Sequence, residues 1–240
     1  MERNVPVNQV KTIGAADVVV VLLSGGIDST TLLHAVCRTP GMGAVHALSF
    51  AYGQKHAREL DMAAWQARAA GVASHRTIDM SFFAALTRGG SALTDPDIAV
   101  PDLASLAANQ LQQPPTYVPN RNMILLSLAA AAAESLGAEA VYYGAQAQDR
   151  YGYWDCTTEF IDRLNHVFSL NRGRGVTIRA PFATMPKSDV VCEGLRMGVD
   201  YRHTWSCYRG GVRPCGDCPT CIERQRAFAS AGVGDPLLSN

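Results

Sequence analysis

The chain has 240 residues, enough for one large domain or for a domain with an appendage. Its 48% hydrophobic and 18% charged residues are typical of a globular chain with a sizeable core. Because 21 Lys and Arg residues balance 21 Asp and Glu residues, the formal charge of zero argues against a nucleic-acid partner as polyanionic as tRNA. No apolar run approaches the ~20 residues that span a bilayer and no apolar leader segment is present, so we expect a cytoplasmic protein without membrane contact.

Strand-like apolar runs alternate with helix-like stretches through most of the chain. Strands are expected at 18–23, 44–50, 74–78, 139–144 and 176–180, and helices at 29–38, 56–71 and 121–136. This alternation predicts a doubly wound α/β fold with a parallel sheet. From about residue 185 the strands stop, and the tail predicts a helix, a cysteine cluster and a second helix.

Residues 88–119 interrupt this rhythm with several prolines and scattered polar residues. Long irregular segments in compact domains are usually functional or disordered, so we expect an insertion that acts as a lid or an oligomer contact. The expected organisation is an α/β domain over 1–184 that carries this insertion, followed by a helical, metal-binding region over 185–240.

The loop Ser24–Ser29, with the sequence SGGIDS, follows the first expected strand and leads into a helix. A strand, a tight glycine turn and a helix N-terminus together form a nest of N–H groups that binds anions. The loop lacks the Lys-Ser/Thr ending of the common nucleotide P-loop. Its Asp and flanking serines instead resemble the pyrophosphatase loop, SGGxDS, of enzymes that split ATP between the α- and β-phosphates. The pattern predicts a catalytic ATP site, with a simple chain turn as the alternative.

Four cysteines near the C-terminus form a compact cluster. They are Cys207, Cys215, Cys218 and Cys221, separated by seven, two and two residues. Four thiolates complete the tetrahedral shell of a structural Zn²⁺ site and leave no open position for a reacting water. An iron–sulfur cluster is the main alternative, because thiolate ligands alone do not separate the two, and buried or redox cysteines are a further one.

Two further segments carry polar groups that could bind a ligand. Arg121 and Asn122 open the helix at 121–136, where they could also be a cap and a solvated charge. Lys187 could neutralise a phosphate or simply begin a helix.

The segment 144–156 follows a strand, the place where ligands bind in open α/β sheets. It holds two carboxylates and three aromatic residues: Asp149, Tyr151, Tyr153, Trp154 and Asp155. Aromatic faces stack on planar bases, and a carboxylate accepts the paired N–H donors of a guanine Watson–Crick edge. We therefore expect a base pocket with Asp155 as the acceptor; an aromatic-rich surface loop is the alternative.

Taken together, these residues resemble the QueC family of 7-cyano-7-deazaguanine (preQ0) synthases over nearly the whole chain from about residue 17. The matching motifs are SGGIDSTT at 24–31, LSFAYGQKH at 48–56, YVPNRN at 117–122, GYWDC at 152–156, and WSC at 205–207 with the cysteine cluster. The resemblance implies a Rossmann-like sheet of the adenine nucleotide alpha hydrolase (PP-loop) type with a helical zinc-binding tail. It also implies ATP-driven conversion of 7-carboxy-7-deazaguanine to a nitrile with ammonia, in a homodimer.

The resemblance also assigns site residues. The catalytic set is Ser24, Asp28, Ser29 and Lys187. ATP with Mg²⁺ is expected at Ser24, Gly25, Gly26, Asp28, Ser29, Thr30, Arg121 and Lys187. The deazaguanine is expected at Tyr52, Gln54, Arg121, Asn122, Asp149, Tyr153 and Asp155, and structural Zn²⁺ at the four clustered cysteines.

This sequence departs from the family pattern at several positions of the expected base pocket. Asn120 stands where the family usually has Gly, Arg150 stands at its Tyr/Phe position, and Tyr151, Trp154 and Thr157 replace Ser, Pro and Arg. Because the ATP loop is intact, activation is expected, while the acceptor stays open. The alternatives are a QueC-like paralogue that conjugates the activated base to an amine of a partner protein in anti-phage defence, a tRNA-modifying PP-loop enzyme, and a non-enzymatic zinc-stabilised binding module.

Overall fold

A five-stranded parallel sheet forms the centre of the computed structural model, which describes residues 17–39, 41–55, 58–107, 113–147, 152–173 and 175–238. The strands are β1 (Asp17–Leu22), β2 (Met42–Ala51), β3 (Ser74–Asp79), β4 (Ala140–Tyr142) and β5 (Thr177–Arg179). Their order is β3-β2-β1-β4-β5, and every neighbouring pair is parallel. The predicted doubly wound α/β sheet is confirmed.

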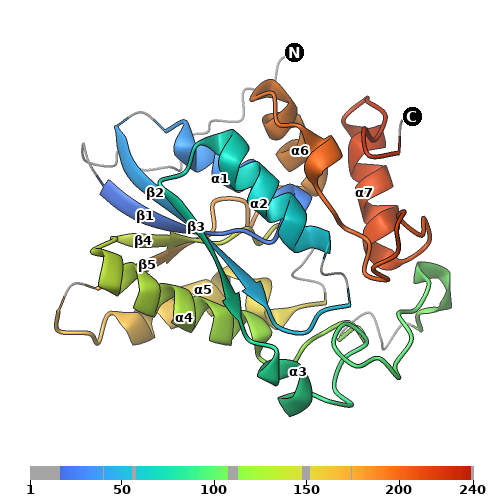
Figure 1. The fold of residues 1–240 in the computed structure, drawn as a ribbon, viewed down its shortest axis with the longest axis horizontal. Coiled ribbons are helices and arrows are strands. Elements are labelled where there is room, and N and C mark those ends of the chain that lie inside the picture. The colour runs from blue at the N-terminus through green and yellow to red at the C-terminus, as the bar shows by residue number, and fades with distance from the viewer. Residues whose placement is uncertain are drawn as a thin grey trace.

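Helices cover both faces of the sheet (Figure 1). They are α1 (Ile27–Cys37), α2 (Arg58–Ala70), α3 (Phe82–Leu86), α4 (Arg121–Leu136), α5 (Thr158–Phe168), α6 (Lys187–Arg196) and α7 (Pro219–Ser230), with 3₁₀ turns at Leu103–Ser105, Trp154–Cys156 and Tyr201–His203. Helices α1 and α2 lie on one face, and α4 and α5 lie on the other. No helix in the described part of the chain is long and apolar enough to cross a membrane.

From Val18 to Leu22, strand β1 is apolar because it is covered on both faces. Val19 and Val21 belong to the hydrophobic cluster shared with α1 and α2, whereas Val20 and Leu22 belong to the cluster shared with α4 and α5. Alternate side chains of a strand point to opposite faces, so a central strand covered on both sides needs apolar residues at every position. This burial fixes β1 at the centre and places the loop after it at the carboxyl edge of the sheet.

The structure contains two helices, α3 and α5, that the sequence analysis did not predict. In α5 the residues Phe160, Ile161 and Leu164 are buried, and the N-cap Thr157 accepts a hydrogen bond from the amide of Phe160. The described parts of 88–119 contain no strand and only the short turn at Leu103–Ser105, in agreement with an interruption of the α/β rhythm.

The C-terminal helices pack directly against the α/β domain. Ile27 of α1, Val191 of α6 and Phe228 of α7 belong to one buried cluster, and Tyr201 joins it. The hydroxyl groups of Tyr201 and Thr31 lie 2.7 Å apart, which ties the tail to α1. Through these contacts the tail shares a core with the helix that follows the glycine loop.

Candidate active site

The loop Ser24–Ser29 is organised by its two serines. The Oγ atoms of Ser24 and Ser29 lie 3.0 Å apart, and the Ser29 Oγ also accepts a hydrogen bond from the Ser24 amide at 3.1 Å. The amide of Gly26, the N-cap of α1, donates to the Ser24 Oγ at 3.3 Å. The loop thus curls over the N-terminus of α1, where backbone N–H groups and the helix dipole favour an anion.

Two glycines hold the loop close to its neighbours. Gly25 has a φ of 85°, and a Cβ there would lie 2.1 Å from the carbonyl oxygen of Glu59. A Cβ on Gly144, after β4, would lie 3.1 Å from the amide nitrogen of Ser29. Gly25 needs glycine because of its positive φ and the close backbone of α2, and at Gly144 an added Cβ would be in tight contact with the loop backbone.

A cavity of about 240 Å³ opens beside this loop. It lies between the loops that follow β1 and β4, where the strand order reverses and where open α/β sheets bind ligands. Nine of the predicted site residues line it: Ser24, Gly26, Asp28, Ser29, Tyr52, Arg121, Asn122, Tyr153 and Lys187. The loop Ser24–Ser29, the predicted phosphate loop, and much of the expected base pocket therefore share one cavity.

Four other predicted residues do not line the cavity. Gly25 lies against the backbone of Glu59, and Thr30 is fully buried in α1. Gln54 is also buried, and its amide is hydrogen-bonded to the chain around it. Asp155 is only 1% exposed, and its Oδ2 accepts a hydrogen bond from the amide of Asn122 at 3.3 Å. Asp149 lies outside the described residues.

Lys187 connects the phosphate loop to the tail. Its Nζ lies 3.1 Å from Oδ2 of Asp28 and 2.7 Å from Oε2 of Glu223 on α7. Burial raises the pKa of the Asp28 carboxyl, and the charge of Lys187 opposes that rise. The other oxygen of Asp28, Oδ1, is buried with no hydrogen-bond partner among the described residues. A buried, orphaned carboxylate oxygen beside a phosphate loop fits a hard, oxygen-binding cation such as Mg²⁺.

The opposite wall carries Arg121 at the start of α4. Its Nη1 donates to the Tyr52 hydroxyl at 3.1 Å, and its guanidinium lies 5.6 Å from the centre of the Tyr52 ring. Its Nε donates to Oδ1 of Asn122 at 3.2 Å. The Tyr153 hydroxyl lies 2.8 Å from the Thr116 Oγ1. This wall offers a held cation and aromatic faces, which suit a planar, anionic ligand.

Two positions that depart from the family pattern have clear local reasons. Asn120 has a φ of 53° and is the non-glycine residue with positive φ in the described part of the chain. Asn tolerates this left-handed conformation, so it can stand in for Gly there. Trp154 is 44% exposed, packs edge-on against Phe160 and donates to the Tyr117 hydroxyl at 2.9 Å. Its ring does not line the cavity.

Several lining residues were not among the predicted site residues. Glu59 lies in the first turn of α2, Tyr143 follows β4, and Trp205, Tyr208, Thr220 and Glu223 come from the tail. Glu59 lies within a few residues of Tyr52, but a carboxylate at the start of a helix is also an ordinary dipole partner. The tail residues reach the site only through tertiary packing: the amide of Trp205 donates to the Gly25 carbonyl at 2.9 Å.

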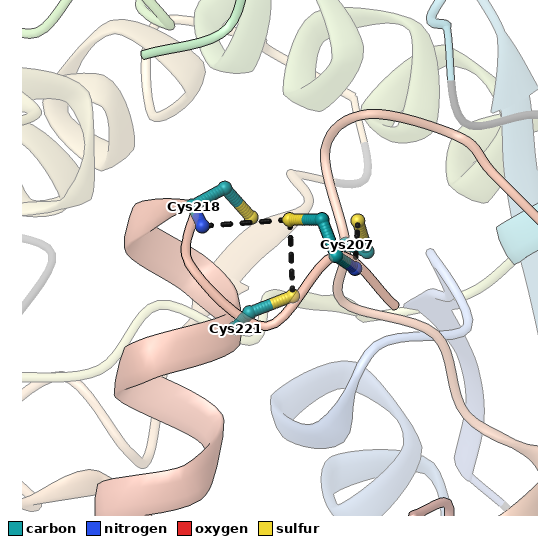
Figure 2. Close-up of side chains that lie close together, drawn as sticks. Cys207, Cys218 and Cys221 are labelled. Atoms are coloured by element: carbon teal, nitrogen blue, oxygen red, sulfur yellow. Dashed lines mark hydrogen bonds between the residues drawn. The ribbon is translucent and has the colours of Figure 1, made fainter. Parts of the chain in front are cut away.

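The four predicted cysteines meet at one point, and Figure 2 shows three of them, Cys207, Cys218 and Cys221. Their sulfur atoms all lie within 4.8 Å of one another. Cys218 and Cys221 lie at the start of α7, while Cys207 belongs to a separate loop. Cys207, Cys218 and Cys221 are buried and Cys215 is half-buried, and none of the four lines the cavity. Four converging thiols of this kind form a site that could hold a metal, closed off from the cavity.

Comparisons with known proteins agree with this geometry. The family model described as "Queuosine biosynthesis protein QueC" matches residues 18–232. A protein of Marinobacter nauticus named 7-cyano-7-deazaguanine synthase is 48% identical over 221 residues, covering 92% of this chain and 96% of that protein. Proteins of the same name from Caldicellulosiruptor bescii (46% identical, 91% and 95% covered) and Archaeoglobus fulgidus (47%, 92% and 90%) match similarly. The chain belongs to the QueC family.

Proposed function

We propose that the chain is an ATP-dependent ligase that converts 7-carboxy-7-deazaguanine to 7-cyano-7-deazaguanine, with ammonia as the nitrogen donor. The synthase names of its relatives support the product. The observation that carries the proposal is the single cavity that brings the phosphate loop, Lys187 and the Arg121–Tyr52 pair together. An enzyme that joins AMP to a substrate carboxylate needs both ligands in one space.

The first step activates the carboxylate. A carboxylate oxygen attacks the α-phosphorus of ATP, and the bond to pyrophosphate breaks. The N–H groups at the start of α1 and the ammonium of Lys187 stabilise the departing pyrophosphate. Mg²⁺, held by Asp28, would neutralise phosphate charge when bound. On this assignment the Lys187–Asp28 pair serves the phosphates.

The later steps use two adenylates, the acyl adenylate and a second one formed on the amide oxygen. Ammonia attacks the acyl carbon, AMP leaves, and the nitrogen loses a proton to give the primary amide. The amide oxygen then attacks the α-phosphorus of a second ATP, and pyrophosphate leaves. Loss of AMP and of both N–H protons gives the nitrile. A secondary amide, formed with a bulkier amine, has too few N–H protons to reach a neutral nitrile.

The proposed base site comprises Tyr52, Gln54, Arg121, Asn122, Asp149, Tyr153 and Asp155. Arg121 suits the anionic carboxylate, and Tyr52 and Tyr153 offer aromatic faces. Gln54 and Asp155 lie behind this wall, against Tyr52 and Asn122 respectively. The direct contact between Asp155 and the base stays a prediction.

The proposed metal of the cysteine cluster is one structural Zn²⁺. Cys207, Cys215, Cys218 and Cys221 could supply a complete tetrahedral shell, and the absence of all four from the cavity lining supports a structural role. The ion would hold the first turn of α7, which carries Thr220 and Glu223 to the cavity wall.

Product analysis tests the proposed function. The purified protein is incubated with 7-carboxy-7-deazaguanine, Mg-ATP and ammonium, and the products are identified by mass spectrometry. We expect the nitrile, with two ATP consumed per molecule formed. A reaction that stalls at the adenylate or the primary amide after one ATP would instead favour the conjugating paralogue. No adenylation of the acid would contradict both.

A further inference from the structure

The proposed substrate presents two different ends to the protein. Its 7-carboxylate must reach the phosphate loop, while the guanine-like edge of the ring offers two neighbouring N–H donors, the ring N–H and the 2-amino group. A carboxylate matches such a donor pair best, because its two oxygens can accept both hydrogen bonds at once. The cavity should therefore contain a carboxylate that is not engaged with the phosphates.

Three carboxylates line the cavity in the described part of the chain: Asp28, Glu59 and Glu223. Asp28 and Glu223 both pair with Lys187, which places them at the phosphate end. Asp155 does not reach the cavity and accepts the amide of Asn122. Burial also raises the pKa of Asp155, against the charge of Arg121, so its environment disfavours the charged acceptor. Among the carboxylates of the described residues, these contacts leave Glu59 as the one placed for the base.

Gln54 holds Glu59 in a fixed direction. The Gln54 Oε1 accepts the amide of Tyr52 at 2.8 Å, and its Nε2 donates to the Phe50 carbonyl at 3.1 Å and to the Glu59 Oε1 at 3.0 Å. Because the backbone contacts fix which end of the amide is the donor, Gln54 must face Glu59 with an N–H group. This bond orients the carboxylate before any ligand arrives.

The segment Phe50–Gln54, which carries the positioning Gln54, also supplies the stacking surface. Tyr52 and Phe50 line the cavity beside Glu59, and Arg121 holds the Tyr52 hydroxyl. Gly53, between Tyr52 and Gln54, has a φ of 86°, and a Cβ there would lie 2.4 Å from the Cβ of Ala84. Ring stacking thus comes from the segment that precedes α2, edge recognition comes from the first turn of α2, and the Gln54–Glu59 hydrogen bond joins the two.

We infer that Glu59 is the residue that accepts the paired N–H donors of the deazaguanine, with Gln54 as its positioning residue. This inference rests on the proposed function. On this assignment Glu59 selects a purine-like ring that carries a 2-amino group. Asp155 accepts the amide of Asn122 and thereby supports the start of α4.

Calorimetric binding with two ligands tests the assignment. The ligands are 7-carboxy-7-deazaguanine and the same molecule without its 2-amino group. The wild-type protein should prefer the amino-bearing ligand. Glu59→Gln should weaken binding of that ligand by about tenfold to a hundredfold and remove most of the preference, because the charged acceptor is lost. Binding of a non-hydrolysable ATP analogue should be unchanged.

Controls separate recognition from folding. Asp61→Asn, an exposed acid-to-amide change on the same helix, should leave both affinities at wild-type values. If Glu59→Gln does not fold, Glu59→Asp keeps the charge on a shorter stem. It should weaken the amino-bearing ligand selectively while retaining part of the preference.

Other outcomes would overturn the inference. Equal weakening of both ligands, or loss of ATP-analogue binding, would make Glu59 a structural or nucleotide-site residue. An unchanged preference in Glu59→Gln together with a lost preference in Asp155→Asn would return the base contact to Asp155. A wild-type protein that binds neither ligand would end the proposed function itself, and the inference with it.

Discussion

The ion pair of Asp28 and Lys187 lies where, on the proposed function, both a triphosphate and a cation would bind. Lys187 lies between two carboxylates, Asp28 and Glu223, and one oxygen of Asp28 remains buried without a partner among the described residues. A triphosphate that engages Lys187 would replace carboxylate contacts with phosphate contacts. A cation on Asp28 would offset the burial that raises the pKa of its carboxyl.

Asp28→Ala should reduce pyrophosphate release by at least about a hundredfold, because the loop loses the carboxylate proposed to hold Mg²⁺ against the phosphates. The melting temperature should stay close to that of the wild type, since removal of Asp28 leaves Lys187 paired with Glu223. ATP-to-pyrophosphate exchange, measured over a series of Mg²⁺ concentrations, checks this. Undiminished exchange would remove Asp28 from the phosphate site.

Gly25→Ala should destabilise the loop by about 1–3 kcal/mol, because the residue combines a positive φ with a close approach to the Glu59 carbonyl. Gly71→Ala is the matched control: its φ is 70°, but no atom lies within 4 Å of the added Cβ. Denaturant unfolding of both variants separates the clash from the conformational strain. Equal losses of unfolding free energy in the two variants would show that the close approach of α2 adds nothing to the effect of the positive φ.

Helices α1 and α2 are joined to the tail by a hydrogen-bonded chain. The His34 Nε2 lies 2.9 Å from the Gln66 Oε1, and the Gln66 Nε2 donates to the carbonyls of Asp200 and His203. Burial lowers the pKa of His34, while the bond to Gln66 opposes that change. The neutral imidazole is therefore the form that the folded protein stabilises.

Acidification should weaken the fold through this contact. Because the pKa of His34 is lower in the folded than in the unfolded state, the unfolded chain binds more protons, and stability falls as the pH drops below about 6.5. His34→Gln should flatten the dependence of the melting temperature on pH between 7.5 and 5.5. The exposed His166→Gln variant should keep the wild-type slope. Identical slopes in all three proteins would exclude His34 as a source of the effect.

At the scale of the whole molecule, local patterns predicted the sheet and the loop, but not the complete site. The predicted strand and helix boundaries agree with the structure within two residues, because buried strands and amphipathic helices follow local periodicity. Glu59 and Glu223 reach the cavity only because α2 and α7 pack around the loop. Asp155 was expected at the cavity, yet its carboxylate is turned to the amide of Asn122. Such choices depend on contacts between distant segments.

The cysteine cluster should contain about one zinc per chain by elemental analysis, and Cys218→Ser should lose the metal and be poorly soluble. Cys192→Ser, outside the cluster, should retain both metal and solubility. Chelation of the wild-type protein should lower its melting temperature, because the first turn of α7 loses its anchor. A coloured protein that contains iron would contradict the zinc assignment.

Lys187 pairs with both Asp28 and Glu223, and this arrangement has a consequence for folding during synthesis. Ser24 and Glu223 lie 199 positions apart in the sequence, yet both line one cavity. A chain still emerging from the ribosome can pair its first strands and form the glycine loop, but it lacks the wall that α7 provides. Contacts of such long sequence separation form late in folding. The wall of the cavity is thus complete only when synthesis has passed the cysteine cluster, so on the proposed function a shorter chain would lack part of the site.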